Sequence, residues 1–169
     1  FGPRKGAAEL EGSKVFSKRI MTENMIPTAT ARAFSDHDRC IEFLETADFP
    51  LVIKADGLAA GKGVFIPQSL EEGKEALDAC FVTKKFGEAG NRVLIEEHLQ
   101  GEECSVFAFT DGNTIAVLPT ARDYKRAYTG DEGPNTGGMG SYSPSTRLTS
   151  AIMDQVVGQI LVPTVHAMN

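Results

Sequence analysis

The stretch of residues 51–64, LVIKADGLAAGKGV, constrains the fold more than any other part of the chain. An apolar run suited to a strand reaches Lys54, and a loop of glycine and alanine follows that carries Lys62. Small side chains leave the backbone amides of such a loop open, and open amides beside ammonium groups favour the binding of phosphate oxygens. The pattern predicts a phosphate-binding loop, with a solvent-facing strand-end lysine as the plainer alternative for Lys54.

The loop departs from the Walker A pattern. That pattern needs a glycine where this chain has Asp56 and a hydroxyl where it has Gly63. The segment 64–67 also favours a strand, whereas a helix follows a Walker A loop. The sequence therefore predicts a phosphate loop between two strands, which is a different architecture for binding a nucleotide.

The composition is ordinary for a soluble globular protein of one or two small domains. The 169 residues are 41% hydrophobic and 24% charged, and no apolar stretch approaches the ~20 residues of a membrane span. A net charge of −6 argues against non-specific nucleic-acid binding. The cysteines Cys40, Cys80 and Cys104 lie far apart, which favours reduced core thiols and a cytoplasmic protein. Because the chain does not begin with Met, we expect a piece of something longer.

Periodicity, capping residues and turn residues predict an α+β order of elements. We expect helices over residues 7–24 (with Ser13 capping its second part), 35–47 (capped by Ser35), 69–81 (capped by Ser69) and 149–169 (kinked or ended by Pro163). We expect strands over residues 28–34, 51–55, 64–66 and 93–97, and a hairpin of 104–110 with 114–118. Residues 122–146, which are polar and rich in glycine, are expected to form a long functional loop.

An acidic group follows the strand expected over residues 93–97. Glu96 and Glu97 close this strand, Leu99 follows, and Glu102 and Glu103 come after a turn. Alone this pattern is typical of a solvated strand end. Beside a phosphate loop it favours a nucleotide site, in which strand-end backbone groups meet an adenine edge, a carboxylate binds ribose and Leu99 packs on the purine.

A third group combines charge with glycine. Asp123, Lys125 and Arg126 precede the segment 133–140, GPNTGGMG, whose glycines leave several N–H donors exposed. A flexible polar loop is the plainer alternative. We expect an anion site for a second, phosphate-bearing substrate. No arrangement of serine, cysteine or histidine indicates a nucleophile, and the histidines lack the spacing of metal ligands.

These motifs resemble the glycinamide ribonucleotide synthetase (phosphoribosylamine–glycine ligase) family of the ATP-grasp superfamily, over essentially the whole chain. The matching segments are 10–14, 53–64, 95–97 with 101–103, Asp123, 125–126 and 133–140. The resemblance implies an ATP-grasp fold. Residues 28–97 would form its small lobe of antiparallel sheet and helices, residues 1–27 a helix of the central domain, and residues 98–169 another part of that domain.

The resemblance also implies roles for individual residues. Those that would bind ATP, together with Leu99, are Lys14, Lys54, Ala59, Ala60, Gly61, Lys62, Gly63, Glu96, Glu97 and Glu103. Those that would bind the second substrate are Asp123, Lys125, Arg126, Asn135, Thr136, Gly137, Gly138, Met139 and Gly140. Arg122 and Tyr124 stand where the family is expected to have Gln and His.

The activity implied is that of a ligase in purine synthesis. ATP would activate the carboxylate of glycine as a glycyl phosphate, and the amine of 5-phosphoribosylamine would displace phosphate, giving glycinamide ribonucleotide and ADP. The protein would position the reactants and neutralise their charge, and it would form no covalent intermediate with them. The ligands of Mg²⁺, a Glu-x-Asn pair, are expected beyond Asn169, so the chain alone should be inactive and depend on the remaining domains of its parent enzyme.

Two alternatives stay open. The parent could be another ATP-grasp carboxylate–amine ligase, which trials of other acids and amines would reveal. It could also be a non-catalytic nucleotide-binding module, for which substituting Lys54 or Lys62 would leave the parent's rate intact. Neither nucleic acid nor membrane is expected as a partner.

Overall fold

The computed structural model describes residues 2–59, 62–130 and 132–169. The chain divides into two compact units, Phe1–Glu23 with Thr28–Leu99 and Asn24–Pro27 with Gln100–Asn169. Both N-terminal helices, α1 (Lys5–Gly12) and α2 (Lys14–Glu23), belong to the first unit. The division into segments 1–27, 28–97 and 98–169 stays a prediction.

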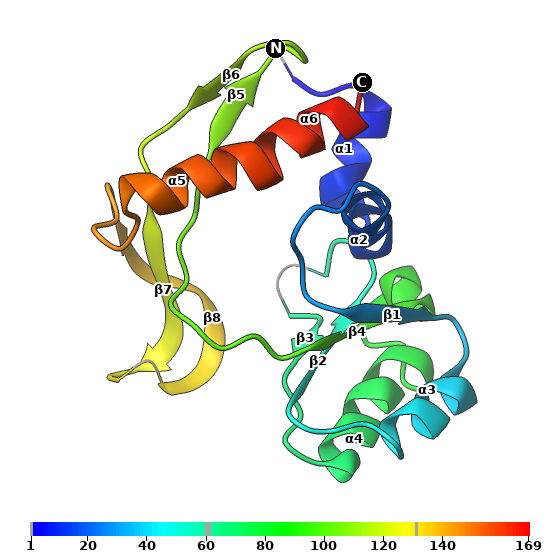
Figure 1. The fold of residues 1–169 in the computed structure, drawn as a ribbon. Helices are drawn as coiled ribbons and strands as arrows, with labels where there is room; N and C mark the ends of the chain where they lie inside the picture. The colour runs from blue at the N-terminus through cyan, green and yellow to red at the C-terminus, as the bar shows by residue number, and fades with distance from the viewer. Residues whose placement is uncertain (1, 60–61, 131) are drawn as a thin grey trace. The chain divides into compact units, whose positions relative to one another are not determined.

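The first unit is built on an antiparallel sheet. Its strands are β1 (Ala31–Phe34), β2 (Leu51–Ala55), β3 (Val64–Phe65) and β4 (Val93–Glu97), in the order β1-β4-β2-β3. The helices α3 (His37–Leu44) and α4 (Leu70–Phe81) pack on one face of it (Figure 1). The short helix η1 (Gly87–Asn91) leads into β4. The core between sheet and helices consists of Cys40, Leu44, Leu51, Ile53, Ala55, Ala76, Leu77, Cys80, Val93 and Ile95.

The alternation of side chains along β2 and β4 leaves a polar pair on the opposite face of this sheet. Ile53 and Ile95 point into the core, so their neighbours Lys54 and Glu96 point away from it. Because Lys54 lies opposite Leu94 in the antiparallel register, Lys54 and Glu96 are diagonal neighbours on one face. The other face of the small sheet is therefore where charged chemistry gathers.

The helices of this unit differ from expectation at their ends. The single helix expected over residues 7–24 is two helices, because Ser13 is extended (φ −140°, ψ 116°) and its hydroxyl accepts the Phe16 amide at the start of α2. The cap of α3 is Asp36, which accepts the Arg39 amide, so the expectation of Ser35 was wrong by one residue. The Ser69 cap of α4 is confirmed.

The second unit consists of two hairpins and a long helix. The first hairpin pairs β5 (Ala108–Thr110) with β6 (Ile115–Val117), as expected. The expected long loop over residues 122–146 was wrong, because β7 (Arg122–Tyr128) and β8 (Glu132–Tyr142) pair as a second hairpin. Polar strands with irregular register and glycines at positive φ conceal the alternation that normally reveals a hairpin.

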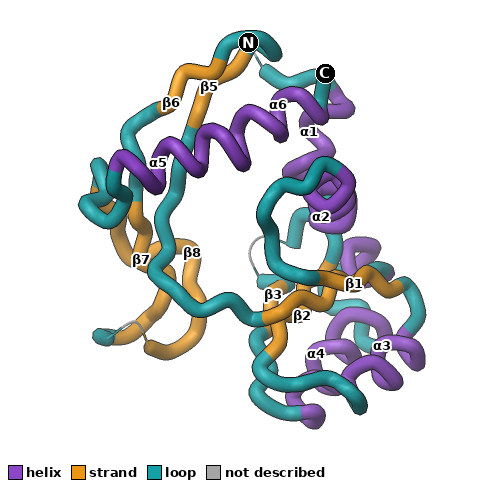
Figure 2. The backbone as a smooth tube through the Cα atoms, viewed as in Figure 1, coloured by secondary structure: helices purple, strands orange, loops and turns teal. Residues whose placement is uncertain are grey.

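The C-terminal helix is irregular but unbroken. It runs through α5 (Ser150–Val156), the π-helical segment η2 (Val157–Leu161) and α6 (Val162–Ala167) (Figure 2). Pro163 has no N–H, and its ring would clash with a carbonyl of the preceding turn. The wider π-helical turn η2 ends two residues before Pro163, and the helix continues past Pro163 and does not end there.

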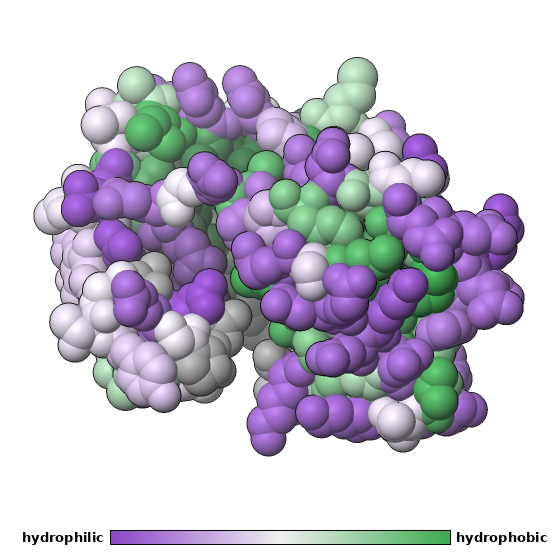
Figure 3. Space-filling view, turned by 90° about the horizontal axis from the view of Figure 1, so that it is seen from below, coloured by the Kyte–Doolittle hydropathy of each residue, from purple (hydrophilic) through white to green (hydrophobic). Residues whose placement is uncertain are grey.

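The surface agrees with the composition. On the face drawn in Figure 3, hydrophilic side chains predominate and hydrophobic ones form smaller patches. Within the part of the chain that the structure describes, no helix has both the length and the apolar character needed to cross a bilayer.

Candidate functional site

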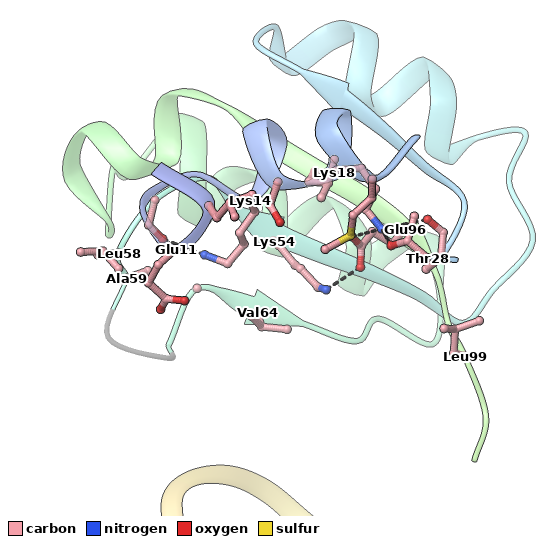
Figure 4. Close-up of a pocket in the computed structure, with 17 residues that line it drawn as sticks. Glu11, Lys14, Lys18, Thr28, Lys54, Leu58, Ala59, Val64, Glu96 and Leu99 are labelled. Carbon is pink, nitrogen blue, oxygen red and sulfur yellow. Dashed lines mark hydrogen bonds and ion pairs between the residues drawn. The ribbon is translucent and has the colours of Figure 1, made fainter. Parts of the chain in front are cut away.

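A cavity of about 790 Å³ lies in the first unit, on the sheet face opposite α3 and α4. Its size is within the range of ligand pockets, roughly 300–1,000 Å³. Residues of the first two helices form one wall, strand residues form the floor, and the segments 28–29 and 57–59 border it (Figure 4). The lining is mixed, with lysines and acids among aliphatic side chains.

Glu96 is the electrostatic centre of this cavity. Its side chain is only 7% exposed, and Lys54 Nζ lies 2.5 Å from its Oε2 atom while Lys18 Nζ lies 2.9 Å from its Oε1 atom. Lys18 is 13% exposed and also donates to Thr28 Oγ1 (2.6 Å) and the Ala29 carbonyl (2.8 Å). These acceptors use all three donors of the Lys18 ammonium, which is therefore a structural cation. Lys54 is 29% exposed and keeps donor capacity on the cavity side.

Lys14 forms the opposite side of the site. Its Nζ atom donates to the carbonyls of Ala55 (3.0 Å) and Gly57 (2.7 Å), which lie where β2 passes into the loop. Gly57 has φ +113°, a conformation that glycine adopts at little cost. Lys14 therefore brings a positive charge from α2 to the first turn of the glycine-rich loop.

The end of that loop needs glycine for a different reason. A Cβ atom on Gly63 would lie 2.7 Å from the Cβ of Ala59 and 3.1 Å from the Cβ of Ala55. The loop therefore closes back on its own start, and the Ala55 amide donates to the Gly63 carbonyl at 2.8 Å.

Buried Asp56 connects these segments. Its carboxylate accepts the Ser13 hydroxyl and the Val15 amide, both at 3.0 Å, and forms an ion pair with Arg92. Burial alone would raise the pKa of Asp56, but hydrogen bonds from Val15, from the Arg92 guanidinium and from the capping hydroxyl outweigh it and hold that pKa below its ordinary value. Asp56 is thus ionised in the folded chain.

Most of the residues expected at a nucleotide site meet at this cavity. Those that line it are Lys14, Lys54, Ala59, Gly63, Glu96 and Leu99. Lys62 is exposed and does not line the cavity, and Glu97 Oε1 accepts the Thr30 amide at 2.7 Å. Glu103 belongs to the second unit. Ala60 and Gly61 lie outside the described residues.

Sequence reasoning missed several lining residues. Glu11, Lys18 and Met21 lie on the cavity with Lys14. Lys14, Lys18 and Met21 recur at helical spacing within α2, which places them on one face, so this signal was available in the sequence. Glu11 lies on α1, before the break at Ser13. Thr28 and Ala29 carry no such signal, because they lie in an irregular segment before β1.

The residues expected to bind a second substrate lie together on the β7–β8 hairpin. Arg126 Nη1 donates to the Gly133 carbonyl at 2.7 Å, and Thr136 Oγ1 donates to the Lys125 carbonyl at 2.9 Å. Lys125 Nζ lies 3.4 Å from Asp123 Oδ2. Gly138 and Gly140 have positive φ, while Gly137 and Met139 are exposed. Asn135 pairs with Arg126 through the strand register.

The two departures from the family pattern contact each other. The guanidinium of Arg122 lies 5.5 Å from the ring centre of Tyr124, a cation–π distance. The Tyr124 ring lies 6.1 Å from that of Tyr142, and Arg122 Nη1 lies 3.9 Å from Glu102 Oε1. Arg122 and Tyr124 thus form a local cluster with their strand partner. The described residues contain no group of three or more His, Cys, Asp or Glu side chains placed to hold a metal ion.

The fold and the cavity place the chain in the ATP-grasp class, and the predicted α+β fold class is confirmed. The crystal structure of phosphoribosylamine–glycine ligase from Thermotoga maritima is similar over 99% of this chain, with a TM-score of 0.90 and 40% identity. A phosphoribosylamine–glycine ligase from Leptospira interrogans is 50% identical over 96% of the chain. The bifunctional purine biosynthetic protein ADE1 of Schizosaccharomyces pombe is 51% identical over 99%.

The chain belongs to the phosphoribosylglycinamide synthetase ATP-grasp (A) domain family, whose sequence model matches residues 12–169. The resemblance read from the motifs is thereby confirmed. The chain spans 42% of the Thermotoga protein, 38% of the Leptospira protein and 21% of the Schizosaccharomyces protein, and so less than half of each.

Proposed function

We propose that this chain is the nucleotide-binding part of a phosphoribosylamine–glycine ligase of purine synthesis. That enzyme joins glycine to 5-phosphoribosylamine at the expense of ATP and yields glycinamide ribonucleotide, ADP and phosphate. The observation that carries the proposal is the cavity that Lys14 and Lys54 both line, together with the start of a glycine-rich loop. Family membership and the names of the relatives support the reaction.

The cavity suits ATP in size and in charge. A triphosphate carries about four negative charges, and ammonium groups in a partly desolvated site stabilise such charge far better than surface lysines do. Lys54 and Lys14 would hold the phosphates, and the segment Ala59–Gly63, which includes Lys62, would cover them. Lys18 would stay on Glu96 as a fixed counter-charge.

The adenosine end would lie at the far end of β4. Leu99 lines the cavity two residues after the end of this strand and would pack on the purine. Backbone groups near Glu97 would meet the adenine edge. Glu103 remains our proposal for ribose, and Mg²⁺ would be bound by residues outside this chain.

The second substrate is assigned to the β7–β8 hairpin. Lys125 and Arg126 supply positive charge there, and Gly138 and Gly140, both at positive φ and without side chains, would let a phosphate approach the backbone closely. In this account the chain holds and neutralises the reactants, while glycine's own carboxylate and the amine perform the bond exchange. The remaining domains of a cytoplasmic enzyme would complete the site.

A chimera tests this function. The chain would replace the matching residues of the Leptospira interrogans ligase, to which it is 50% identical, and release of ADP would be followed with ATP, glycine and 5-phosphoribosylamine. We expect turnover that requires both glycine and the amine, and at least a tenfold loss with Lys54→Ala but not with the surface change Lys85→Ala. A chimera that folds yet prefers another acid or amine would point to a different ATP-grasp ligase, and an undiminished Lys54→Ala rate would contradict the role of the cavity.

A further inference from the structure

Asp56 is a buried charge for which the proposed function gives no direct role. Its side chain is 7% exposed, and it is not among the residues that line the cavity. It follows β2 directly and precedes Gly57, at the point where the glycine-rich loop begins. A buried carboxylate at such a point needs an explanation, because burial of a charge is costly unless partners compensate for it.

The partners of Asp56 come from two other segments. Oδ1 accepts the Ser13 hydroxyl and the Val15 amide, so the carboxylate caps the N-terminus of α2 from outside that helix. Oδ2 accepts Arg92 Nε at 2.7 Å, and the second guanidinium nitrogen of Arg92 completes a two-pronged ion pair. Asp56 therefore joins the start of α2, the end of β2 and the start of β4.

The connection is reciprocal. While Asp56 holds the first turn of α2, the first residue of that helix, Lys14, donates to the carbonyls on either side of Asp56. The Asp56 amide in turn donates to the Arg92 carbonyl at 2.9 Å. A shift of the loop start would therefore move Lys14, and a shift of α2 would move the loop.

We propose that Asp56 and Arg92 form a positioning pair that sets the distance between Lys14 and the start of the glycine-rich loop, and thereby the grip of the site on the outer phosphates of a nucleotide. The inference rests on the proposed function and adds residues that do not touch the nucleotide. Asp56 acts through α2 and Gly57, both of which border the cavity. Its loss should weaken contacts to the outer phosphates more than contacts to the adenosine end.

An ordinary helix cap would behave differently. Ser69 caps α4 by accepting the Glu72 amide, and it does not line the cavity. Its removal should lower the melting temperature without selective loss of phosphate binding. Ser69→Ala is therefore the matched control for Asp56→Asn.

The experiment compares two nucleotides on the chimera described above, in which the remaining domains of the Leptospira interrogans ligase complete the chain. Dissociation constants for AMP-PNP, and for AMP, which lacks the outer phosphates, would be measured by calorimetry for the wild type, Asp56→Asn, Arg92→Lys and Ser69→Ala. We expect Asp56→Asn to weaken the binding of AMP-PNP at least tenfold and the binding of AMP less than twofold. Arg92→Lys keeps the charge but loses the two-pronged geometry of the ion pair, so it should weaken the binding of AMP-PNP by about threefold. Ser69→Ala should leave both constants unchanged.

The inference is overturned if Asp56→Asn binds AMP-PNP with the wild-type affinity, or if the substitution weakens the binding of AMP as much as that of AMP-PNP. It is also overturned if Ser69→Ala shows the same selective loss of AMP-PNP binding. If Asp56→Asn does not fold, Arg92→Lys decides by the same comparison. Failure of the wild type to bind AMP-PNP would instead contradict the proposed function, and the inference with it.

Discussion

Lys54 and Glu96 form an ion pair of 2.5 Å between neighbouring antiparallel strands, on the sheet face that carries the cavity. Glu96 is almost fully buried, and Lys54 is exposed enough to meet a ligand. Because Lys18 holds the other carboxylate oxygen, Lys54 can turn to a phosphate without leaving Glu96 unpaired. This arrangement makes the pair a prepared site for an anion.

The shared carboxylate predicts unequal effects of removing either partner. Glu96→Gln leaves two lysines without their common counter-charge and should lower the free energy of unfolding by about 3 kcal/mol. Lys54→Met leaves Glu96 paired with Lys18, so we expect a loss of about 1 kcal/mol. Urea denaturation measures both. Glu23→Gln, which breaks an exposed pair with Arg19, serves as control and should change stability by less than about 0.5 kcal/mol. Equal losses for Glu96→Gln and Lys54→Met would contradict the shared arrangement.

The loop closure at Gly63 predicts a selective effect of one methyl group. Gly63→Ala places a Cβ 2.7 Å from that of Ala59, so the loop must move, and we expect at least a fivefold weaker AMP-PNP affinity in a calorimetric titration. Gly6→Ala is the matched control, because nothing lies within 4 Å of a Cβ there and the change favours helix α1. Unchanged affinity in Gly63→Ala would show that the loop shape is irrelevant to binding.

The lowered pKa of Asp56 predicts how stability changes in acid. Because this pKa is lower in the folded chain than in the unfolded chain, the stabilisation is fully present above the ordinary value of 3.8 and is lost as the pH falls through the folded value. The difference in unfolding free energy between wild type and Asp56→Asn should therefore be largest at neutral pH and shrink below about pH 4. Denaturant titrations at several pH values measure it, with exposed Asp48→Asn as control. A difference that grows in acid would refute the assignment.

The three cysteines should differ in reactivity. Burial raises the pKa of Cys40 to about 12 and that of Cys80 to about 11, so both stay protonated and inaccessible. Cys104 is only half-buried, with its Sγ 3.4 Å from the Ala121 carbonyl. In native chain at pH 8, iodoacetamide should label Cys104 first, and all three residues should react in urea. Mass spectrometry identifies the labelled cysteines, and Cys104→Ser should abolish the early labelled product. Rapid labelling of Cys40 in the native chain would contradict its burial in the core.

The first unit could largely be predicted from the sequence because its signals are local. The strands β2 and β4 match the expected ranges 51–55 and 93–97, because each begins with a short apolar run that a charged residue follows. The capping pattern that begins at Ser69 likewise predicted the start of α4 correctly. Ser13 was expected to cap the second part of the N-terminal helix, and its hydroxyl does accept the Phe16 amide at the start of α2. The complete break at Ser13 was not expected, and the partner of its hydroxyl, Asp56, lies 43 residues away.

The candidate site was predictable in its motifs but not in its connections. Lys14, Lys54 and Glu96 were named from the sequence. Helical spacing could have added Lys18 to the cavity face, but the ion pairs of Lys18 with Glu96 and of Arg92 with Asp56 join distant segments and were not predictable. The β7–β8 hairpin was not predicted from the sequence, for a different reason. Its glycines and charges satisfy the strand ladder without a hydrophobic face, so periodicity carried no signal.

Amide hydrogen exchange of the chimera with the Leptospira interrogans ligase, with and without AMP-PNP, reports where on this chain the nucleotide lies. If the cavity holds the nucleotide, protection should appear at residues 14–18, 57–59, 62–63 and 94–99, and it should disappear in Lys54→Ala. Protection confined to residues 122–142, or none anywhere at saturating nucleotide, would contradict the account.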